Sequence, residues 1–163
     1  MTDKKIKNLK DISLISSKLK NKKKIIVLCH GVFDLLHNGH INHFKEAKRF
    51  GDILIVSITK DEFIKKGFNR PIFKVYERAG CISALEAVDY VVVSPSESAE
   101  NVINLIKPNY YVKGTMSFTH SSTKTICIPI VVFNPYFFLA STHRIMFFFT
   151  RLNIFGEVPI IFV

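Results

Sequence analysis

The chain has 163 residues, of which 48% are hydrophobic and 22% charged, and its formal net charge is +10 at pH 7. This length suits one domain with a proper core and excludes two domains of ordinary size, while the composition excludes a disordered protein. The excess positive charge indicates polyanionic partners, such as nucleic acid, an anionic membrane surface or small phosphorylated ligands.

The N-terminal segment is strongly basic. Its first 24 residues hold nine lysines against two aspartates, so much of the net charge is expected on a solvated face. Leu9, Ile12 and Leu19 recur at helical spacing, which predicts a short amphipathic helix over 9–20. We expect no signal peptide, because the first apolar run begins only at residue 25 and has the length of a strand.

From residue 23 onward, apolar strands alternate with helices. Strands are predicted at 24–29, 53–58, 90–93 and 109–112, and helices at 39–50, 76–87 and 97–106. Mostly apolar strands separated by helices are typical of a parallel sheet covered on both faces, and right-handed crossovers make this a Rossmann-like α/β fold. Because ligands bind such sheets beyond the carboxyl ends of the strands, we expect a site directly after the first strand.

The segment that follows this strand reads "CHGVFDLLHNGH" over residues 29–40. His37 and His40 lie three apart around Gly39, and Asp34 lies three residues before His37, so a metal site, a pair of core histidines and a phosphate cradle are all open. Zinc-binding pairs on a helix usually have H-x-x-x-H spacing and need a third ligand. A glycine at a helix N-terminus lets the backbone approach a phosphate, which the helix dipole and unpaired N–H groups favour. The pattern favours the phosphate cradle.

The segment from Gly31 to His40 resembles the signature of the HxGH nucleotidyltransferases of the cytidylyltransferase-like family. Three later segments also match in order: "KKGFNRPIFKVYER" at 65–78, "KPNYYVKG" at 107–114 and "SSTK" at 121–124. The resemblance covers residues 6–124 and is closest to the nucleotidyltransferase domain of bacterial ADP-heptose synthases, with glycerol-3-phosphate cytidylyltransferase next. It implies a sheet of the nucleotidylyl transferase (HUP) type with helices on both faces.

The resemblance also implies a reaction. A phosphate oxygen of a sugar phosphate or polyol phosphate attacks the α-phosphorus of ATP or CTP, and pyrophosphate leaves, in the biosynthesis of surface polysaccharide. His37 and His40 are expected to stabilise the charge that builds on the phosphates. Lys66 and Arg78 are expected to bring positive charge to the phosphates or the acceptor, which completes the set of predicted catalytic residues.

The predicted nucleotide-binding residues come from the same motifs. By resemblance, backbone N–H groups near Val32 and Phe33 contact the nucleotide, Asp34 shapes the turn, and two hydroxyls hold the β- and γ-phosphates. Arg70 is interpreted as a solvated loop arginine. A Mg²⁺ ion is expected with the triphosphate, held largely by phosphate and water rather than by a metal site of the protein. The full predicted nucleotide-binding set is Gly31, Val32, Phe33, Asp34, Gly39, Gly114, Ser122 and Thr123.

Three widely spaced cysteines without a C-x-x-C pair fit a reducing cytoplasm, so we expect a cytoplasmic protein. The expected partners are ATP or CTP and a phosphorylated sugar or polyol, with no nucleic acid; a homodimer and a partner sugar kinase are left open. Three other functions also stay open. They are a degenerate homologue that binds nucleotide without turnover, a CTP:glycerol-3-phosphate cytidylyltransferase, and an anionic-surface binder that uses the basic N-terminus and the apolar tail.

The family pattern breaks after Gly114. Its relatives continue with an acidic turn, whereas this chain has Thr115-Met116-Ser117, and only six residues separate Gly114 from "SSTK". Either an element has been deleted or the "SSTK" match is accidental. Residues 126–163 then hold eight of the fifteen phenylalanines and only three formal charges.

We therefore divide the chain into a basic N-terminal helix and lead-in at 1–22, a nucleotidyltransferase domain at 23–124 and an atypical apolar tail at 125–163. The tail is open to three interpretations: a buried C-terminal extension, a membrane-seeking tail, or a stretch read out of frame. Our hypothesis is the frameshift, because an exposed surface so rich in phenylalanine would promote aggregation.

Overall fold

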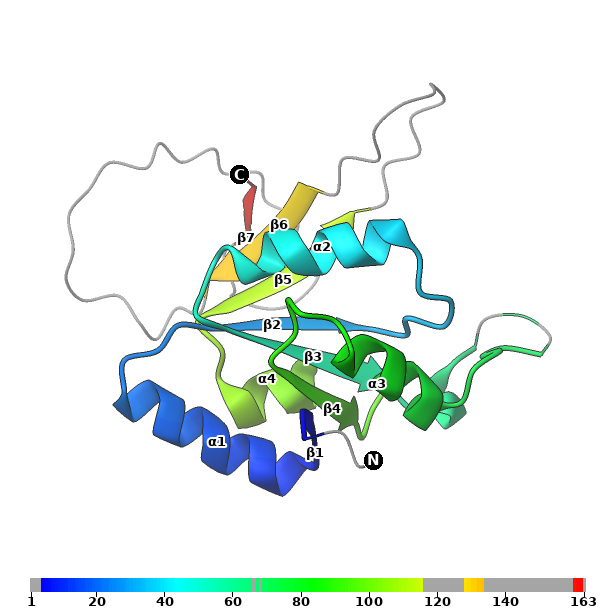
Figure 1. The fold of residues 1–163 in the computed structure, drawn as a ribbon, viewed down its shortest axis with the longest axis horizontal. Helices are drawn as coiled ribbons and strands as arrows, with labels where there is room; N and C mark the ends of the chain where they lie inside the picture. Colours follow the sequence, from blue (N-terminus) through cyan, green and yellow to red (C-terminus); the bar gives the residue numbers. More distant parts are fainter. Residues whose placement is uncertain (1–3, 66, 68, 116–127, 134–159, 163) are drawn as a thin grey trace.

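A sheet with the strand order β1-β4-β3-β2-β5-β6-β7 forms the centre of the computed structural model (Figure 1). The structure describes residues 4–65, 67, 69–115, 128–133 and 160–162. The strands are β1 (Ile6–Lys7), β2 (Ile26–Gly31), β3 (Ile53–Thr59), β4 (Tyr90–Ser94), β5 (Tyr110–Thr115), β6 (Ile128–Phe133) and β7 (Ile160–Phe162). The helices are α1 (Leu9–Asn21), α2 (Asn38–Lys48), α3 (Val75–Ser83) and α4 (Glu100–Ile106), with a short 3₁₀ helix at Asp61–Phe63.

The strands from β1 to β5 are all parallel to their neighbours. Strand β2 lies between β3 and β5, so Cys29 is paired with Val56 on one side and Val112 on the other. This arrangement confirms the predicted Rossmann-like parallel sheet. Strands β6 and β7 were not predicted, and they extend the sheet in the antiparallel sense.

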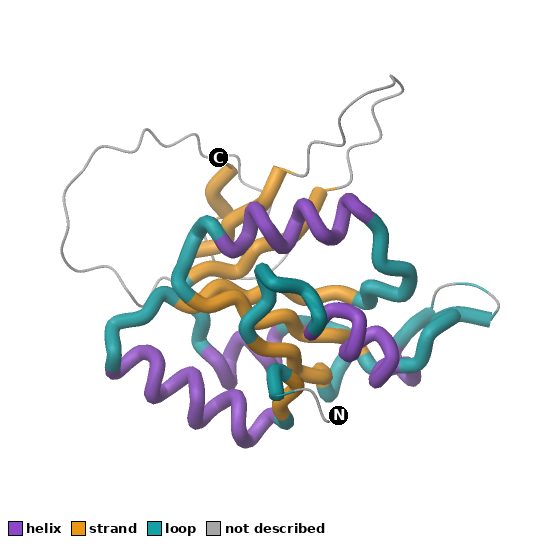
Figure 2. Tube along the Cα trace, viewed as in Figure 1, coloured by secondary structure: helices purple, strands orange, loops and turns teal. Residues whose placement is uncertain are grey.

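The helices cover both faces of the sheet, as the ribbon and the tube both show (Figures 1 and 2). Successive residues of a strand point to opposite faces, so β2 and β3 supply side chains to two separate cores. On one face Val27 and Val56 pack with Phe44 of α2 and Ala79 of α3; on the other Leu28 and Ile55 pack with Ile12 of α1 and Val102 of α4. Within the described part of the chain, no helix is long and apolar enough to cross a membrane.

The N-terminal helix α1 packs against α4 and the sheet as part of the second core. The Asn8 side chain caps α1 by accepting a hydrogen bond from Asp11 N. Farther along the helix, Ser16 Oγ and Lys20 Nζ both donate to the Ile106 carbonyl, each at 2.7 Å, which satisfies the C-terminal end of α4. The predicted boundary after residue 22 therefore falls between elements that share one core, and the domain division itself stays a prediction.

Two helices are shorter than the periodicity indicates. Helix α3 ends at Ser83 rather than at 87, because the chain then turns so that Asp89 N donates to the Leu54 carbonyl ahead of β4. Helix α4 begins at Glu100 rather than at 97. Serine hydroxyls bond to nearby backbone before it, such as Ser96 Oγ to the Ser98 carbonyl, and such local bonds compete with helix formation.

Candidate active site

His37 and His40 lie together at the start of α2, at the carboxyl-end edge of the parallel sheet. His37 is the N-cap residue, and its Nδ1 accepts a hydrogen bond from Gly39 N at 3.1 Å. The two imidazole rings are stacked, with centroids 3.9 Å apart and planes 27° apart. The structure therefore brings the two predicted histidines into one pair beside a helix N-terminus, where the helix dipole favours an anion.

The two glycines of the signature are closely approached by aromatic rings. A Cβ added to Gly39 would lie 2.8 Å from His37 Cε1, and one added to Gly31 would lie 2.9 Å from Phe33 Cζ. Real Cβ atoms almost never lie this close to another atom. The sequence favours Gly39 for close approach to a ligand, and the structure adds that its missing side chain makes room for the His37 ring.

Asp34 connects the turn between β2 and α2 to the loop that precedes α3. Its carboxylate accepts hydrogen bonds from Arg70 Nη1 at 2.8 Å, from Ile72 N at 2.8 Å and from Phe73 N at 3.1 Å. Burial alone would raise the pKa of Asp34, but the bonds from Arg70 and two backbone N–H groups outweigh it and lower the pKa. Arg70 is exposed, as expected of a solvated loop arginine, and it also forms an ion pair with Asp34.

Arg78 is buried beneath the signature loop, and its side chain is 0% exposed. Its Nε donates to the Phe73 carbonyl at 3.0 Å, Nη2 donates to the Thr59 carbonyl at 2.9 Å, and Nη1 donates to the Val32 carbonyl. This geometry is at odds with the expected direct contact between Arg78 and the phosphates or the acceptor, because all three guanidinium nitrogens already bond to protein oxygens and none reaches the surface.

The remaining predicted residues are placed only in part. Lys66, Ser122 and Thr123 lie outside the described residues, so their assigned roles stay predictions. Gly114 lies near the end of β5, where its backbone is paired with Pro129 of β6.

His30 is a polar residue of this region to which the sequence analysis assigned no role. It lies near the end of β2, and its ring nitrogens are 3.1 Å from Ser57 Oγ, 3.3 Å from the Glu97 carbonyl and 3.3 Å from Thr59 Oγ1. Burial is the main cause that lowers the pKa of His30; the Glu97 carbonyl opposes the shift, and the charge of Lys113 adds to it. Its position at the carboxyl end of the first strand was the available signal.

The acidic and histidine side chains near the signature loop are the candidates for a metal site in this region. In the parts of the chain that the structure describes, no three His, Cys, Asp or Glu side chains form a group that could hold a metal ion. The carboxylates of Asp34 and Asp61 are both bonded to arginines. Neither carboxylate is therefore without a partner, and the Mg²⁺ ion expected from the sequence stays a prediction.

A parallel sheet whose first long strand is followed by a helix that begins with an HxGH segment is typical of an HxGH nucleotidyltransferase. The family model for cytidylyltransferase-like proteins matches residues 28–128. The chain belongs to the cytidylyltransferase-like family, which confirms the resemblance seen in the sequence.

Relatives and a solved structure agree with this assignment. The chain is 42% identical over 115 residues to the bifunctional protein HldE of Nitratiruptor sp., a match that covers 69% of this chain and 25% of that protein. It is 42% identical over 111 residues to HldE of Aliarcobacter butzleri, covering 67% and 23%. The chain thus spans about a quarter of the length of these curated relatives. The crystal structure of the lipopolysaccharide core biosynthesis protein from Thermoplasma volcanium is 34% identical with a TM-score of 0.50, covering 54% of this chain and 72% of that one.

Proposed function

We propose that this chain transfers a nucleotidyl group from ATP or CTP to a sugar phosphate or polyol phosphate and releases pyrophosphate, and that the product is a nucleotide-activated sugar for surface polysaccharide. The observation that carries the proposal is the stacked pair of His37 and His40 at the N-terminus of α2. The similarity to HldE and to the lipopolysaccharide core biosynthesis protein supports a product that is used for surface polysaccharide. A cytoplasmic location, a homodimer and a partner sugar kinase remain parts of the proposal.

The proposed reaction needs no nucleophile from the enzyme. A phosphate oxygen of the acceptor forms a bond to the α-phosphorus while the bond from that phosphorus to the β-phosphate oxygen breaks, and pyrophosphate carries away the electron pair. Such a displacement depends on positioning and on stabilising the charge that develops on the phosphate oxygens. The N-terminus of α2 and the two imidazoles supply that stabilisation in our proposal.

The contacts of His37 indicate which of its nitrogens faces the ligand. Because Nδ1 accepts from Gly39 N, the proton of the neutral ring is assigned to Nε2. Nε2–H is then the group of this ring that can donate to a phosphate oxygen. A Mg²⁺ ion bound with the triphosphate would supply further neutralisation of phosphate charge.

The test is pyrophosphate release measured with a panel of nucleoside triphosphates and sugar or polyol phosphates. We expect release with ATP or CTP, and His40→Ala should lower its rate by about 10²-fold or more, as expected for removing a donor that stabilises developing charge. The matched control is His43→Gln, which replaces a buried histidine three residues further along α2 and should keep the wild-type rate.

Each other result contradicts the proposal in a defined way. Nucleotide binding by calorimetry without release under any pairing would indicate a degenerate binding homologue. Release only with CTP and glycerol 3-phosphate would contradict a nucleotide-activated sugar as the product and would indicate the cytidylyltransferase alternative. Wild-type release by His40→Ala would remove the histidine pair from the mechanism.

A further inference from the structure

Arg78 is the largest fully buried side chain in the described part of the chain. A buried charge is tolerated only where it is bonded, and here the bonds join three segments. The Val32 carbonyl belongs to the signature loop, and the Phe73 carbonyl precedes α3. The third segment is the end of β3 and the turn after it, where Nη2 donates to the Thr59 carbonyl at 2.9 Å and to Asp61 Oδ1 at 2.6 Å.

The residue after Val32 has a backbone conformation that needs such support. Phe33 has φ 50°, in the left-handed region that non-glycine residues rarely adopt. Strained residues of this kind persist only where the surrounding structure holds them. Here the preceding carbonyl is bonded to Arg78, and the following side chain, Asp34, accepts from Ile72 N and Phe73 N. The segment from 72 to 78 therefore holds Phe33 on both sides.

The Phe33 ring is in turn part of the packing around the histidines. It meets the His40 ring edge-on, with centroids 5.3 Å apart at 86°, and the Phe44 ring with centroids 5.0 Å apart. The outer edge of the ring also lies close to Gly31, where an added Cβ would be 2.9 Å from Phe33 Cζ. Because His40 is stacked on His37, the orientation of the Phe33 ring bears on both imidazoles.

These contacts form a continuous path from the Arg78 guanidinium through the Val32 carbonyl and the Phe33 ring to the histidine pair. We propose that Arg78 is a positioning residue, which orients His37 and His40 through Phe33 without touching the substrate. The proposal rests on the function proposed above, because positioning matters only if the histidines act on phosphates.

The first test is Arg78→Lys, whose single ammonium cannot bridge three segments as the planar guanidinium does. We expect kcat for pyrophosphate release to fall about 10-fold or more while KM for the triphosphate changes by less than about threefold, the pattern of an interaction that matters in the transition state. We also expect the ring signals of His37 and His40 in ¹H–¹³C NMR spectra of the nucleotide-free protein to shift. A direct phosphate contact predicts the opposite pattern, a raised KM with unmoved ring signals, and would overturn the proposal.

The NMR readout needs no turnover, so a protein without transferase activity still tests the positioning role. Lys48→Met is the matched control, because it breaks the ion pair of Lys48 with Asp89 at the far end of the same helix. It should destabilise the fold and leave the histidine ring signals unmoved. Equal shifts from Lys48→Met would show that general loosening, and not the path through Phe33, moves the rings.

A double-mutant cycle tests the path itself. Phe33→Leu keeps an apolar side chain but removes the ring that meets His40. Residues that act through one another give non-additive effects, so Arg78→Lys should cost little further kcat and little further shift in the Phe33→Leu background. Additive effects would overturn the relay. If Arg78→Lys does not fold, Asp61→Asn replaces it in the same cycle. This change neutralises the acidic partner of the guanidinium and leaves one oxygen that can accept from Arg78 or from Val75 N.

Discussion

At position 39, the absence of a side chain matters more than freedom of the backbone. Gly39 lies in the first turn of α2, and the His37 ring occupies the space that a Cβ would need. His37 Nδ1 also accepts a hydrogen bond from Gly39 N. Gly39 therefore positions the ring both by leaving space for it and by donating to it. A larger residue at 39 would push the imidazole away without unfolding the helix.

We therefore expect Gly39→Ala to separate activity from stability. Displacing a catalytic group by about an ångström can cost on the order of 10²-fold in rate, so pyrophosphate release should fall about 10-fold or more. The free energy of unfolding should change by less than about 1 kcal/mol, because the helix propensity of alanine offsets the weakened cap. Thermal denaturation and the release assay check both, and a wild-type rate would show that the His37 ring position is not critical.

The control is Gly80→Ala in α3, where an added Cβ would meet nothing within 4 Å. Removing a glycine from a helix interior should stabilise the protein by about 0.5–1 kcal/mol, with no effect on release. A loss of stability at this position would mean that α3 is packed more tightly than the structure shows.

The site residues differ in how far the sequence could predict them. The signature predicted that His37 and His40 lie close together, because residues at i and i+3 share one face at the start of a helix. The buried position of Arg78 could not be predicted, because three of its four partners are the backbone carbonyls of residues 32, 59 and 73, and a carbonyl is present at every position of a sequence. His30 likewise depends on a neighbouring strand for its partners.

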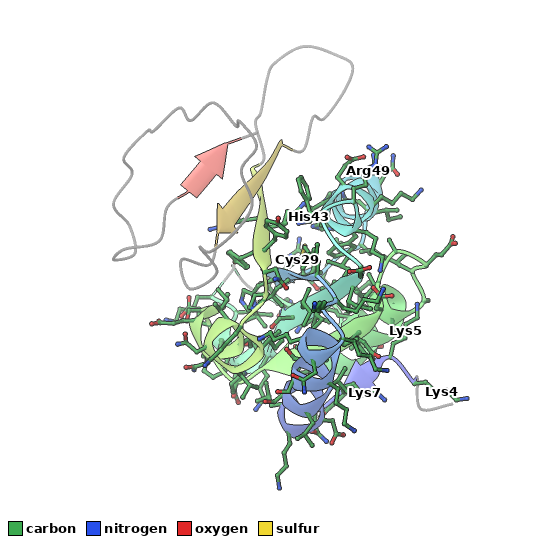
Figure 3. All side chains as sticks on the ribbon, turned by 90° about the vertical axis from the view of Figure 1, so that its left-hand side faces the viewer. Lys4, Lys5, Lys7, Cys29, His43 and Arg49 are labelled. Atoms are coloured by element: carbon green, nitrogen blue, oxygen red, sulfur yellow. The ribbon has the colours of Figure 1, made fainter. Side chains whose placement is uncertain are left out.

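At the scale of elements, α2 has an exposed start and a buried middle. His37 is at its exposed N-terminal end, whereas His43 is 6% exposed and points toward the strands, unlike Arg49 at the other end (Figure 3). The His43 Nδ1 atom is buried without a hydrogen-bond partner among the described residues. Burial therefore lowers the pKa of His43 below its ordinary value of 6.5.

This burial predicts how stability depends on pH. The unfolded chain binds a proton at His43 more readily than the folded chain does, so the stability is fully present above pH 6.5 and falls as the pH drops toward the folded pKa. Such a group contributes a slope of at most about 1.4 kcal/mol per pH unit. Denaturation midpoints of wild type and His43→Gln between pH 7.5 and 5.5 test this: the wild type should lose more stability than the variant. Parallel curves would show that His43 takes up its proton equally in both states.

At the scale of the whole molecule, local pattern predicted the parallel sheet but not its edges. Apolar strands alternating with helices are visible in the sequence, and β2, β3, β4 and β5 lie where that pattern places them, within two or three residues. Strand β1 has two residues, too few for a pattern, and is defined by pairing with β4 about 85 residues later in the chain. Strand β6 lies in the apolar segment that was interpreted as a tail. It was not predicted, because it is defined by antiparallel pairing with β5, and a local sequence pattern does not show such pairing.

The pairing of β5 with β6 gives a test of the frameshift hypothesis, most of which concerns residues outside the described ones. In the full chain β5 has β2 on one side and β6 on the other, with Val112 paired to Cys29 and to Val131. The pairing with β2 covers residues 110–112, and the pairing with β6 covers residues 110–115. The amides of Tyr110, Tyr111 and Val112 should therefore exchange slowly with deuterium whichever neighbouring strand they face.

In a chain that ends at residue 124, β5 becomes an edge strand. Its amides alternate in direction, so those that faced β6 should exchange as exposed groups while those that face β2 stay protected. Hydrogen exchange resolved to single amides measures this, and the amides of β3, which lies between β2 and β4, report whether the shortened chain is folded. If β3 is protected and β5 exchanges identically in both chains, β6 does not complete the sheet and residues 125–163 are a tail outside the fold. If alternate β5 amides exchange quickly only in the shortened chain, the segment that holds β6 is part of the folded domain. An out-of-frame origin would then have to explain a strand that pairs in register with β5.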